Sequence, residues 1–334
     1  MQAINSYASL FLIFLVVKFL FKNLRNEFHK DHQKLAGKKS VPLIGGIIMF
    51  IFYALQTKEL DTFFLLCSLL ILILGILSDN NLINSPKIRL LTQLLIILSY
   101  VYFSEIYILD LKNDFLNTLL ENRLFNLFFI TSCFLVLING SNFIDGLDGL
   151  NLGYFILVIL IIFYIKKTYD IEINQNLLII IFYSLSFLLL LNLLNFLYLG
   201  DSGAYLIAFI LGSFLIHTHN DNLYLSPYLI ALLLWYPAFE NLFSIIRKKL
   251  FKKNPLYPDN GHFHQLLFKL IKKNKKKFIS KYSNIISSLI ILFYNFIVFF
   301  IALKFISQSK ILILILLINI FLYITVYNYL KKFN

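Results

Sequence analysis

Four short polar segments hold most of the side chains in this chain that could do chemistry. They are residues 78–87, 139–149, 199–203 and 258–264, and they interrupt a sequence that is 59% hydrophobic. The first three lie at the ends of apolar runs long enough to cross a bilayer, and the fourth lies in a basic loop. A carboxylate beside hydrocarbon is expensive to desolvate, so several together predict an enzyme site where membrane meets water.

The segment 139–149 gives the strongest of these signals. Asn139, Asn142, Asp145 and Asp148 recur at every third position, so the end of a helix would place them roughly on one side. Its glycines allow a ligand to approach the backbone closely. The alternative is a polar turn between spans, but a turn does not require four amide and carboxylate groups at this spacing. The pattern favours a binding site.

Two single carboxylates each have a structural and a functional interpretation. Asp201 could cap the helix that follows it, or it could hold a hard cation, since Mg²⁺ commonly takes one or two carboxylates plus substrate phosphates. Asp79 is followed by Lys87 and Arg89. It therefore belongs either to a solvated loop with a surface salt bridge or to a phosphate site whose basic groups neutralise charge.

His262 and His264 lie two residues apart in a strongly basic loop. A zinc site would need further ligands, and no other His or Cys obviously completes one. The two histidines therefore suit a sugar or a diphosphate better. The lysines around them are interpreted as a solvated, lipid-facing surface.

The composition indicates a polytopic membrane protein. Only 14% of the 334 residues are charged, against about 25% in soluble domains, and the mean hydropathy is +0.79. The net charge of +13 comes from basic residues in loops beside apolar runs, which fits membrane topology rather than nucleic acid. Cys67 and Cys133 both lie inside apolar runs, so neither a disulfide framework nor a zinc site is expected.

Hydropathy predicts an all-α fold with about eleven transmembrane helices in one domain, residues 1–334. A span needs roughly 20 mainly apolar residues. The expected spans are 4–22, 41–56, 61–78, 88–104, 124–139, 151–166, 176–195, 202–217, 223–240, 283–303 and 310–330. The first lacks the features of a cleaved signal peptide and is expected to be retained.

The basic loops predict the orientation. Loops 23–40 and 241–282 are basic, whereas loop 105–123 is acidic, and Lys331 and Lys332 lie near the end of the chain. Under the positive-inside rule the odd-numbered loops and the C-terminus are cytoplasmic. All four polar segments then face the cytoplasm, although the span count did not assume this. The expected active-site loops are 23–40, 78–89, 139–150, 196–203 and 241–282.

At these residues the chain resembles the polyprenyl-phosphate N-acetylhexosamine-1-phosphate transferases of glycosyltransferase family 4. Residues 139–149 are close to the family pattern Asn-x-x-Asn-x-x-Asp-Gly-x-Asp-Gly, and 200–203 match its Gly-Asp-x-Gly. Residues 41–46 are similar to its early Pro-x-x-Gly-Gly segment, and 75–89 to its paired aspartates with a later basic cluster. Residues 258–265 resemble Pro-Asp-Arg-x-His-x-His-His.

Three positions depart from the family pattern. Ser78 stands where the first of two paired aspartates is usual, so only Asp79 remains of the pair. Asn260 replaces a usual Arg, and Gln265 replaces a last His. Arg247 or Lys248 could share the work of the absent arginine.

The resemblance implies an Mg²⁺-dependent enzyme, with Mn²⁺ as an alternative. Polyprenyl phosphate would attack the sugar-linked phosphate of a UDP-N-acetylhexosamine and release UMP to start cell-envelope glycan synthesis. Asp201 is expected to bind the metal, Asp145 and Asp148 the nucleotide sugar, and Asp79 the lipid phosphate, as base or as charge partner of Lys87. The implied catalytic residues are Asp79, Asp145, Asp148 and Asp201, and the implied substrate-binding residues are Lys87, Asn139, Asn142, His262 and His264.

The expected partners are polyprenyl phosphate, UDP-N-acetylhexosamine and membrane lipid, without nucleic acid, and a homodimer is left open. The expected location is the bacterial inner (plasma) membrane, with the site on its cytoplasmic face. Within the family, a phospho-N-acetylmuramoyl-pentapeptide transferase is the alternative. A lipid or ion transporter is the alternative of another class, but transporters tend to place charges near mid-membrane.

Overall fold

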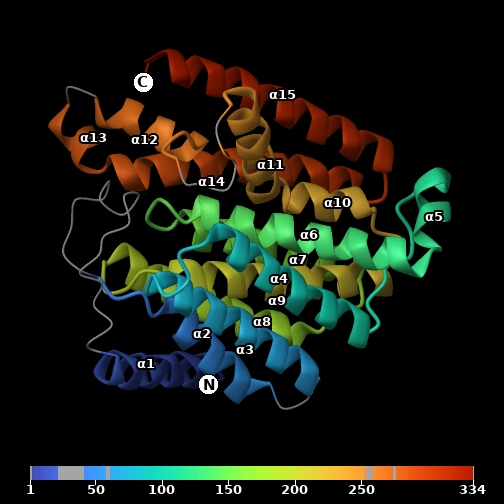
Figure 1. Ribbon diagram of the computed structural model, residues 1–334, viewed down its shortest axis with the longest axis horizontal. Helices are drawn as coiled ribbons and strands as arrows, with labels where there is room; N and C mark the ends of the chain where they lie inside the picture. Colours follow the sequence, from blue (N-terminus) through green and yellow to red (C-terminus); the bar gives the residue numbers. More distant parts are fainter. Residues whose placement is uncertain are drawn as a thin grey trace.

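The fold is built from helices that run side by side (Figure 1). The computed structural model describes residues 2–21, 41–57, 61–252, 254, 259–273 and 276–333. These residues contain helices and one isolated parallel β-bridge, between Leu43 and Tyr198, but no β-strand element. The predicted all-α fold is confirmed. The expected active-site loop at 23–40 and the residue Pro258 lie outside the described residues.

Nine helices of the described residues are long and apolar enough to cross a membrane, or ten if one bent pair is counted as a span. The nine are α1 (Gln2–Leu20), α3 (Thr62–Asp79), α4 (Pro86–Phe103), α6 (Arg123–Ile144), α7 (Leu150–Tyr169), α8 (Gln175–Leu193), α9 (Gly200–Asp221), α14 (Ser283–Ala302) and α15 (Ser309–Phe333). The protein is therefore an integral membrane protein, and the expected number of about eleven is close.

Two expected spans differ in form from the other nine. Helix α2 (Gly45–Gln56) has 12 residues. At about 1.5 Å per residue it falls well short of a hydrocarbon core of about 30 Å. The span expected over 223–240 is divided into α10 (Pro227–Leu233) and α11 (Trp235–Leu250), which are bent by 72°. Shorter elements are α5 (Asp114–Leu120), α12 (Phe263–Lys272), α13 (Lys277–Lys281) and the 3₁₀ helix η2 (Leu303–Phe305).

The bend between α10 and α11 has a local cause. Pro237 lies in the first turn of α11 and has no N–H to donate to a carbonyl in the preceding turn. The carbonyl of Leu233 instead accepts a hydrogen bond from the buried hydroxyl of Tyr154, at 2.8 Å. The bend makes α11 run across the direction of α14 and α15 (Figure 1). It carries the second half of α11 toward the polar end of the bundle.

Helix α9 is the almost wholly buried centre of the fold and packs against α2, α3 and α6. The N-terminus of α9 and helix α3 approach so closely that a Cβ on Gly75 would lie 2.2 Å from the Cα of Ser202. Only glycine fits at that contact. The close approach brings the end of α3, and with it Asp79, to the first turn of α9.

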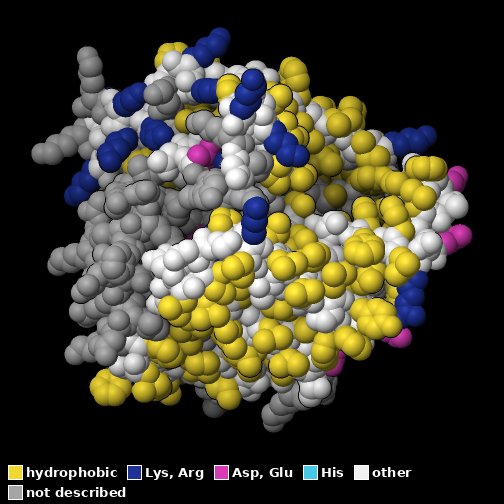
Figure 2. All heavy atoms as spheres, in the orientation of Figure 1, with side chains coloured by type: hydrophobic (Ala, Val, Ile, Leu, Met, Phe, Trp, Pro, Cys, Tyr) yellow, Lys and Arg dark blue, Asp and Glu magenta, His cyan; other side chains and the backbone are white. Residues whose placement is uncertain are grey.

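The surface divides by side-chain type along the helices (Figure 2). Hydrophobic side chains cover the middle of the visible face, as expected for contact with lipid. Basic side chains gather toward the end that carries α12 and α13, and acidic side chains lie near α5 at the other end. This separation agrees with the charge asymmetry of the loops in the sequence.

Candidate active site

The first and third polar segments meet at the N-terminus of α9. The carboxylate of Asp79 accepts hydrogen bonds from the backbone amides of Asp201, at 2.9 Å, and Ser202, at 3.1 Å. Asp79 is only 5% exposed. A carboxylate in this position satisfies amides that have no partner within the helix and interacts favourably with the helix dipole. Asp79 therefore fixes the backbone that carries Asp201.

The side chain of Asp201 is held by two donors from α3 and α4. Its Oδ2 accepts from the hydroxyl of Ser78 at 2.5 Å and from Nη1 of Arg89 at 3.3 Å. Ser78, which stands where the family pattern has an aspartate, thus donates a hydrogen bond to Asp201. Lys87, the expected basic partner, is exposed, whereas Arg89 reaches the carboxylate of Asp201. We call Ser78, Asp79, Arg89, Asp201 and Ser202 the Asp79–Asp201 cluster.

Helix α6 ends at Ile144, so the four-residue pattern is only partly helical. Asn139 donates to Gln93 of α4 at 2.9 Å, and Asn142 donates to the hydroxyl of Tyr205 at 3.4 Å. Asp145 is the C-terminal cap of α6, and Asp148 follows in the loop. The expectation that a single helical side carries all four groups is wrong beyond Asn142, because the helix stops first.

Two asparagines from distant helices position Asp148 instead. The amide N–H of Asp148 donates to Asn284 of α14, and the next amide, Gly149, donates to Asn192 of α8, both at 2.8 Å. Gly149 has φ +74°, a backbone conformation that favours glycine. Asp148 is 8% exposed. The backbone at Asp148 and Gly149 is therefore held in the bundle by contacts that local spacing does not reveal.

Tyr198 connects the acidic loop with the start of α9. It lies two residues before Gly200, and its backbone pairs with residues 42 and 45 through hydrogen bonds of 3.0 and 3.2 Å. Burial, together with the nearby negative charges of Asp148 and Asp145, raises the pKa of the Tyr198 phenol to about 12. The two aspartates and the Asp79–Asp201 cluster thus lie at one end of the bundle.

The second and fourth polar segments also meet. The Nδ1 of His262 lies 2.9 Å from a carboxylate oxygen of Glu240, and its ring lies 4.9 Å from that of Phe143. His264 is completely buried, and a Cβ on Gly146 would lie 2.5 Å from its Nε2. His264 therefore packs against the loop that holds Asp145 and Asp148. The structure thus brings both histidines to the segment 139–149.

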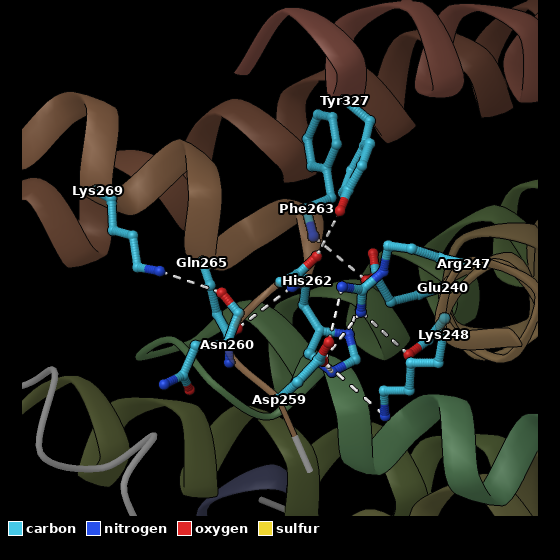
Figure 3. A network of polar contacts seen from close by, with 12 residues as sticks. Glu240, Arg247, Lys248, Asp259, Asn260, His262, Phe263, Gln265, Lys269 and Tyr327 are labelled. Carbon is cyan, nitrogen blue, oxygen red and sulfur yellow. Dashed lines mark hydrogen bonds and ion pairs between the residues drawn. The ribbon is translucent and has the colours of Figure 1, made fainter. Parts of the chain in front are cut away.

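Two basic side chains of α11, Arg247 and Lys248, lie near Asp259 and His262 (Figure 3). Arg247 and Asp259 form an ion pair at 2.7 Å, and the ammonium of Lys248 lies 3.9 Å from the same carboxylate. Burial alone would raise the pKa of Asp259, but the Arg247 guanidinium holds it below its ordinary value. Arg247 thus has an anionic partner within the protein, so a substrate phosphate would have to compete with Asp259.

The sequence interpretation missed Glu240, which lies in α11 and is 1% exposed. It accepts from His262 and, through its other oxygen, from the hydroxyl of Tyr323 at 2.6 Å. The sequence does contain a signal for Glu240. A lone carboxylate inside an apolar run is costly to desolvate, and this usually indicates a functional site. The predicted span 223–240 ends at this residue, and Glu240 was assigned no role there.

The donor atoms of the Asp79–Asp201 cluster fit a hard cation. Carboxylate and hydroxyl oxygens are the ligands that Mg²⁺ prefers. Within the part of the chain that the structure describes, no group of three or more His, Cys, Asp or Glu side chains could hold a metal ion by itself. An Mg²⁺ ion here would take few protein ligands and complete its coordination with water and substrate phosphate.

Comparison with known proteins agrees with this site. The family model described as glycosyl transferase family 4 matches residues 62–219, which include three of the four polar segments. The chain is 28% identical over 255 residues to the undecaprenyl-phosphate alpha-N-acetylglucosaminyl 1-phosphate transferase of Thermotoga maritima, covering 73% of this chain and 74% of that protein. It is 26% identical over 251 residues to a probable undecaprenyl-phosphate N-acetylglucosaminyl 1-phosphate transferase of Bacillus subtilis, covering 69% and 66%. The family model and both relatives support glycosyl transferase family 4 as the family of this chain.

The contacts of Asp79 lead to a prediction about its role. Asp79→Asn keeps an acceptor oxygen but removes the charge at the N-terminus of α9. We expect a loss of roughly 1–2 kcal/mol in unfolding free energy. From its hydrogen bonds to the amides of Asp201 and Ser202 we predict a positioning role, so turnover should fall by a similar factor at every pH. A pH–rate profile and a thermal unfolding curve measure the two effects.

Asp61→Asn is the matched control, because Asp61 caps α3 by accepting from the amide of Phe63 at 2.9 Å. This variant should lose stability while retaining turnover. If Asp79→Asn instead removed only the acid-side limb of the wild-type profile, Asp79 would be a general base and the positioning role would be wrong.

Proposed function

We propose that the protein transfers N-acetylglucosamine-1-phosphate from a UDP-sugar to polyprenyl phosphate. The oxygen of the lipid phosphate attacks the phosphorus that carries the sugar. The bond from that phosphorus to the bridging oxygen breaks, and UMP leaves. The products are polyprenyl-diphospho-N-acetylglucosamine, which starts a cell-envelope glycan, and UMP. The names of both relatives describe such a transfer for those proteins.

One observation carries the proposal: the carboxylates of three segments far apart in sequence meet at one end of a membrane bundle. A lipid-tailed acceptor and a water-soluble donor can both reach such a boundary. Both substrates are anionic, so charge must be neutralised in the transition state. Arg89 supplies one cation at the Asp79–Asp201 cluster.

Each cluster has a distinct role in this proposal. Asp201 would hold Mg²⁺, which when bound supplies positive charge against the diphosphate. Asp79 orients Asp201 through the backbone and needs no proton, since a phosphate monoester is largely ionised near neutral pH, with a second pKa of about 6. Asp145 and Asp148 would bind the nucleotide sugar, with Asn139 and Asn142 bracing α6. His262 and His264 would face the sugar phosphate.

We also propose that the site faces the cytoplasm of a bacterial inner membrane. The support is the gathering of basic side chains at the end of the bundle that carries α12 and α13. That end also holds the histidines. The transporter alternative is less well supported, because the carboxylates lie at helix ends rather than at mid-membrane.

The function is tested with the purified full-length protein in detergent. With Mg²⁺, polyprenyl phosphate and UDP-N-acetylglucosamine, we expect release of UMP and formation of a lipid-linked sugar diphosphate. Omitting the lipid, or chelating the metal with EDTA, should abolish UMP release. UDP-N-acetylgalactosamine and UDP-N-acetylmuramoyl-pentapeptide are tested in parallel. Turnover of the pentapeptide substrate alone would replace the proposed donor, and absence of UMP with every donor would reject the transferase.

A further inference from the structure

Glu240 is a buried carboxylate with three hydrogen-bond donors around it. One oxygen accepts from Nδ1 of His262 at 2.9 Å and from the amide of Phe263 at 3.3 Å. The other accepts from the hydroxyl of Tyr323, on α15, at 2.6 Å. Burying a carboxylate is unfavourable unless it is well bonded, so this arrangement stabilises one defined geometry. Figure 3 shows Glu240 and His262 pointing toward one another.

This contact determines which nitrogen of His262 carries a proton. An ionised carboxylate only accepts hydrogen bonds, so Nδ1 must be the donor. In the neutral ring the other nitrogen, Nε2, is then an acceptor, and in the charged ring it is a second donor. Nε2 lies 3.6 Å from the carboxylate of Asp259. The ring is therefore oriented with Nδ1 toward Glu240 and Nε2 toward Asp259.

His262 is linked through His264 to the loop that carries Asp145 and Asp148. The rings of His262 and His264 are nearly parallel, with an interplanar angle of 15° and centroids 5.7 Å apart. His264 in turn packs against Gly146, between Asp145 and Asp148. A rotation of the His262 ring would therefore disturb its stacking on His264 and, through His264, the packing against Gly146.

We propose that Glu240 is a positioning residue of the transferase, which fixes the tautomer and ring orientation of His262 toward the sugar phosphate. The inference rests on the proposed function, and it adds a residue outside the polar segments. Glu240 acts through His262, as carboxylates that orient a histidine do in other sites. If Glu240 only linked α11 to α12 and α15, its hydrogen bonds would be needed, but the tautomer of His262 would not matter.

The test compares Glu240→Gln with a matched control. Gln keeps the size of the side chain but presents an amide that can donate to Nδ1, so the tautomer is no longer fixed. We expect kcat/KM for the UDP-sugar to fall by about tenfold to a hundredfold. The KM for polyprenyl phosphate should stay within about threefold of wild type. Tyr294→Phe removes a hydrogen bond to Asn319 that also ties α15 to α14, and it should retain wild-type kinetics.

A second readout does not depend on activity. In protein with ¹⁵N-labelled histidine, the His262 signal is assigned by its loss in His262→Gln. We expect wild-type His262 to have the proton on Nδ1 and Glu240→Gln to change that pattern. In kinetics, Glu240→Gln combined with His262→Gln should be little worse than His262→Gln alone, because coupled residues are not additive.

Three results would overturn the inference. They are an unchanged tautomer in Glu240→Gln, additive losses in the double variant, or an activity loss no larger than that of Tyr294→Phe. A wild-type protein that released no UMP would reject the proposed function, whereas the tautomer measurement would still report on Glu240. The two failures are therefore distinguishable.

Discussion

Replacing Asp201 by Asn is expected to lower turnover by about a hundredfold or more, the order seen when a preorganised electrostatic contact is removed. The carboxylate is 8% exposed and is held by Ser78 and Arg89, and its backbone is fixed by Asp79. Asn keeps the shape but loses the charge that would bind Mg²⁺. The measurement is UMP release as a function of Mg²⁺ concentration, in which the variant should need more metal.

Ser78→Ala provides the comparison for Asp201. It removes one hydrogen bond to the carboxylate, at 2.5 Å, but leaves the negative charge. A moderate loss of turnover with an unchanged Mg²⁺ requirement is expected. Near-normal turnover in Asp201→Asn, with Mg²⁺ still required, would show that another group holds the metal.

Replacing Asp148 by Asn is expected to lower kcat/KM for the UDP-sugar by about a hundredfold, with little change in the KM for the lipid. Asp148 is almost buried, and its charge acts together with that of Asp145 to raise the pKa of the neighbouring Tyr198 phenol. Burying a carboxylate beside another one costs folding free energy, and such clusters are typical of functional sites. Steady-state kinetics with each substrate varied in turn provide the measurement.

Asp114→Asn is the control for the second prediction. Asp114 is an exposed residue in the first turn of α5, at the end of the bundle away from the site. It should behave as wild type. If Asp148→Asn also kept both kinetic constants, the loop after α6 would have only a structural role.

Much of the architecture could be predicted from the sequence because it depends on local composition. The long apolar runs predicted the nine helices, since backbone polar groups in lipid must be satisfied within each segment. The basic loops placed the polar segments at one end, and the contacts of Asp79 with Asp201 and of His264 with Gly146 bear out that placement. The resemblance to glycosyltransferase family 4 also came from short motifs of neighbouring residues.

Other features depend on contacts between residues far apart in sequence. Asp79 bonds amides 122 and 123 residues away, so its part in shaping the first turn of α9 has no local signal. The hydroxyl of Tyr154 and the ring of Pro237 together bend α10 against α11, although hydropathy shows one apolar run.

The sequence by itself determined the class of protein, the membrane segments and the acidic motifs, because hydrophobicity and spacing are properties of neighbouring residues. Only the tertiary structure decided which groups act together. Arg89 rather than Lys87 reaches Asp201, Asn284 holds Asp148, and Glu240 holds His262. These partners lie on different helices, and the distance between the helices depends on their packing. One example is Gly75, which lets α3 approach α9 closely. Spacing along one segment cannot report such distances.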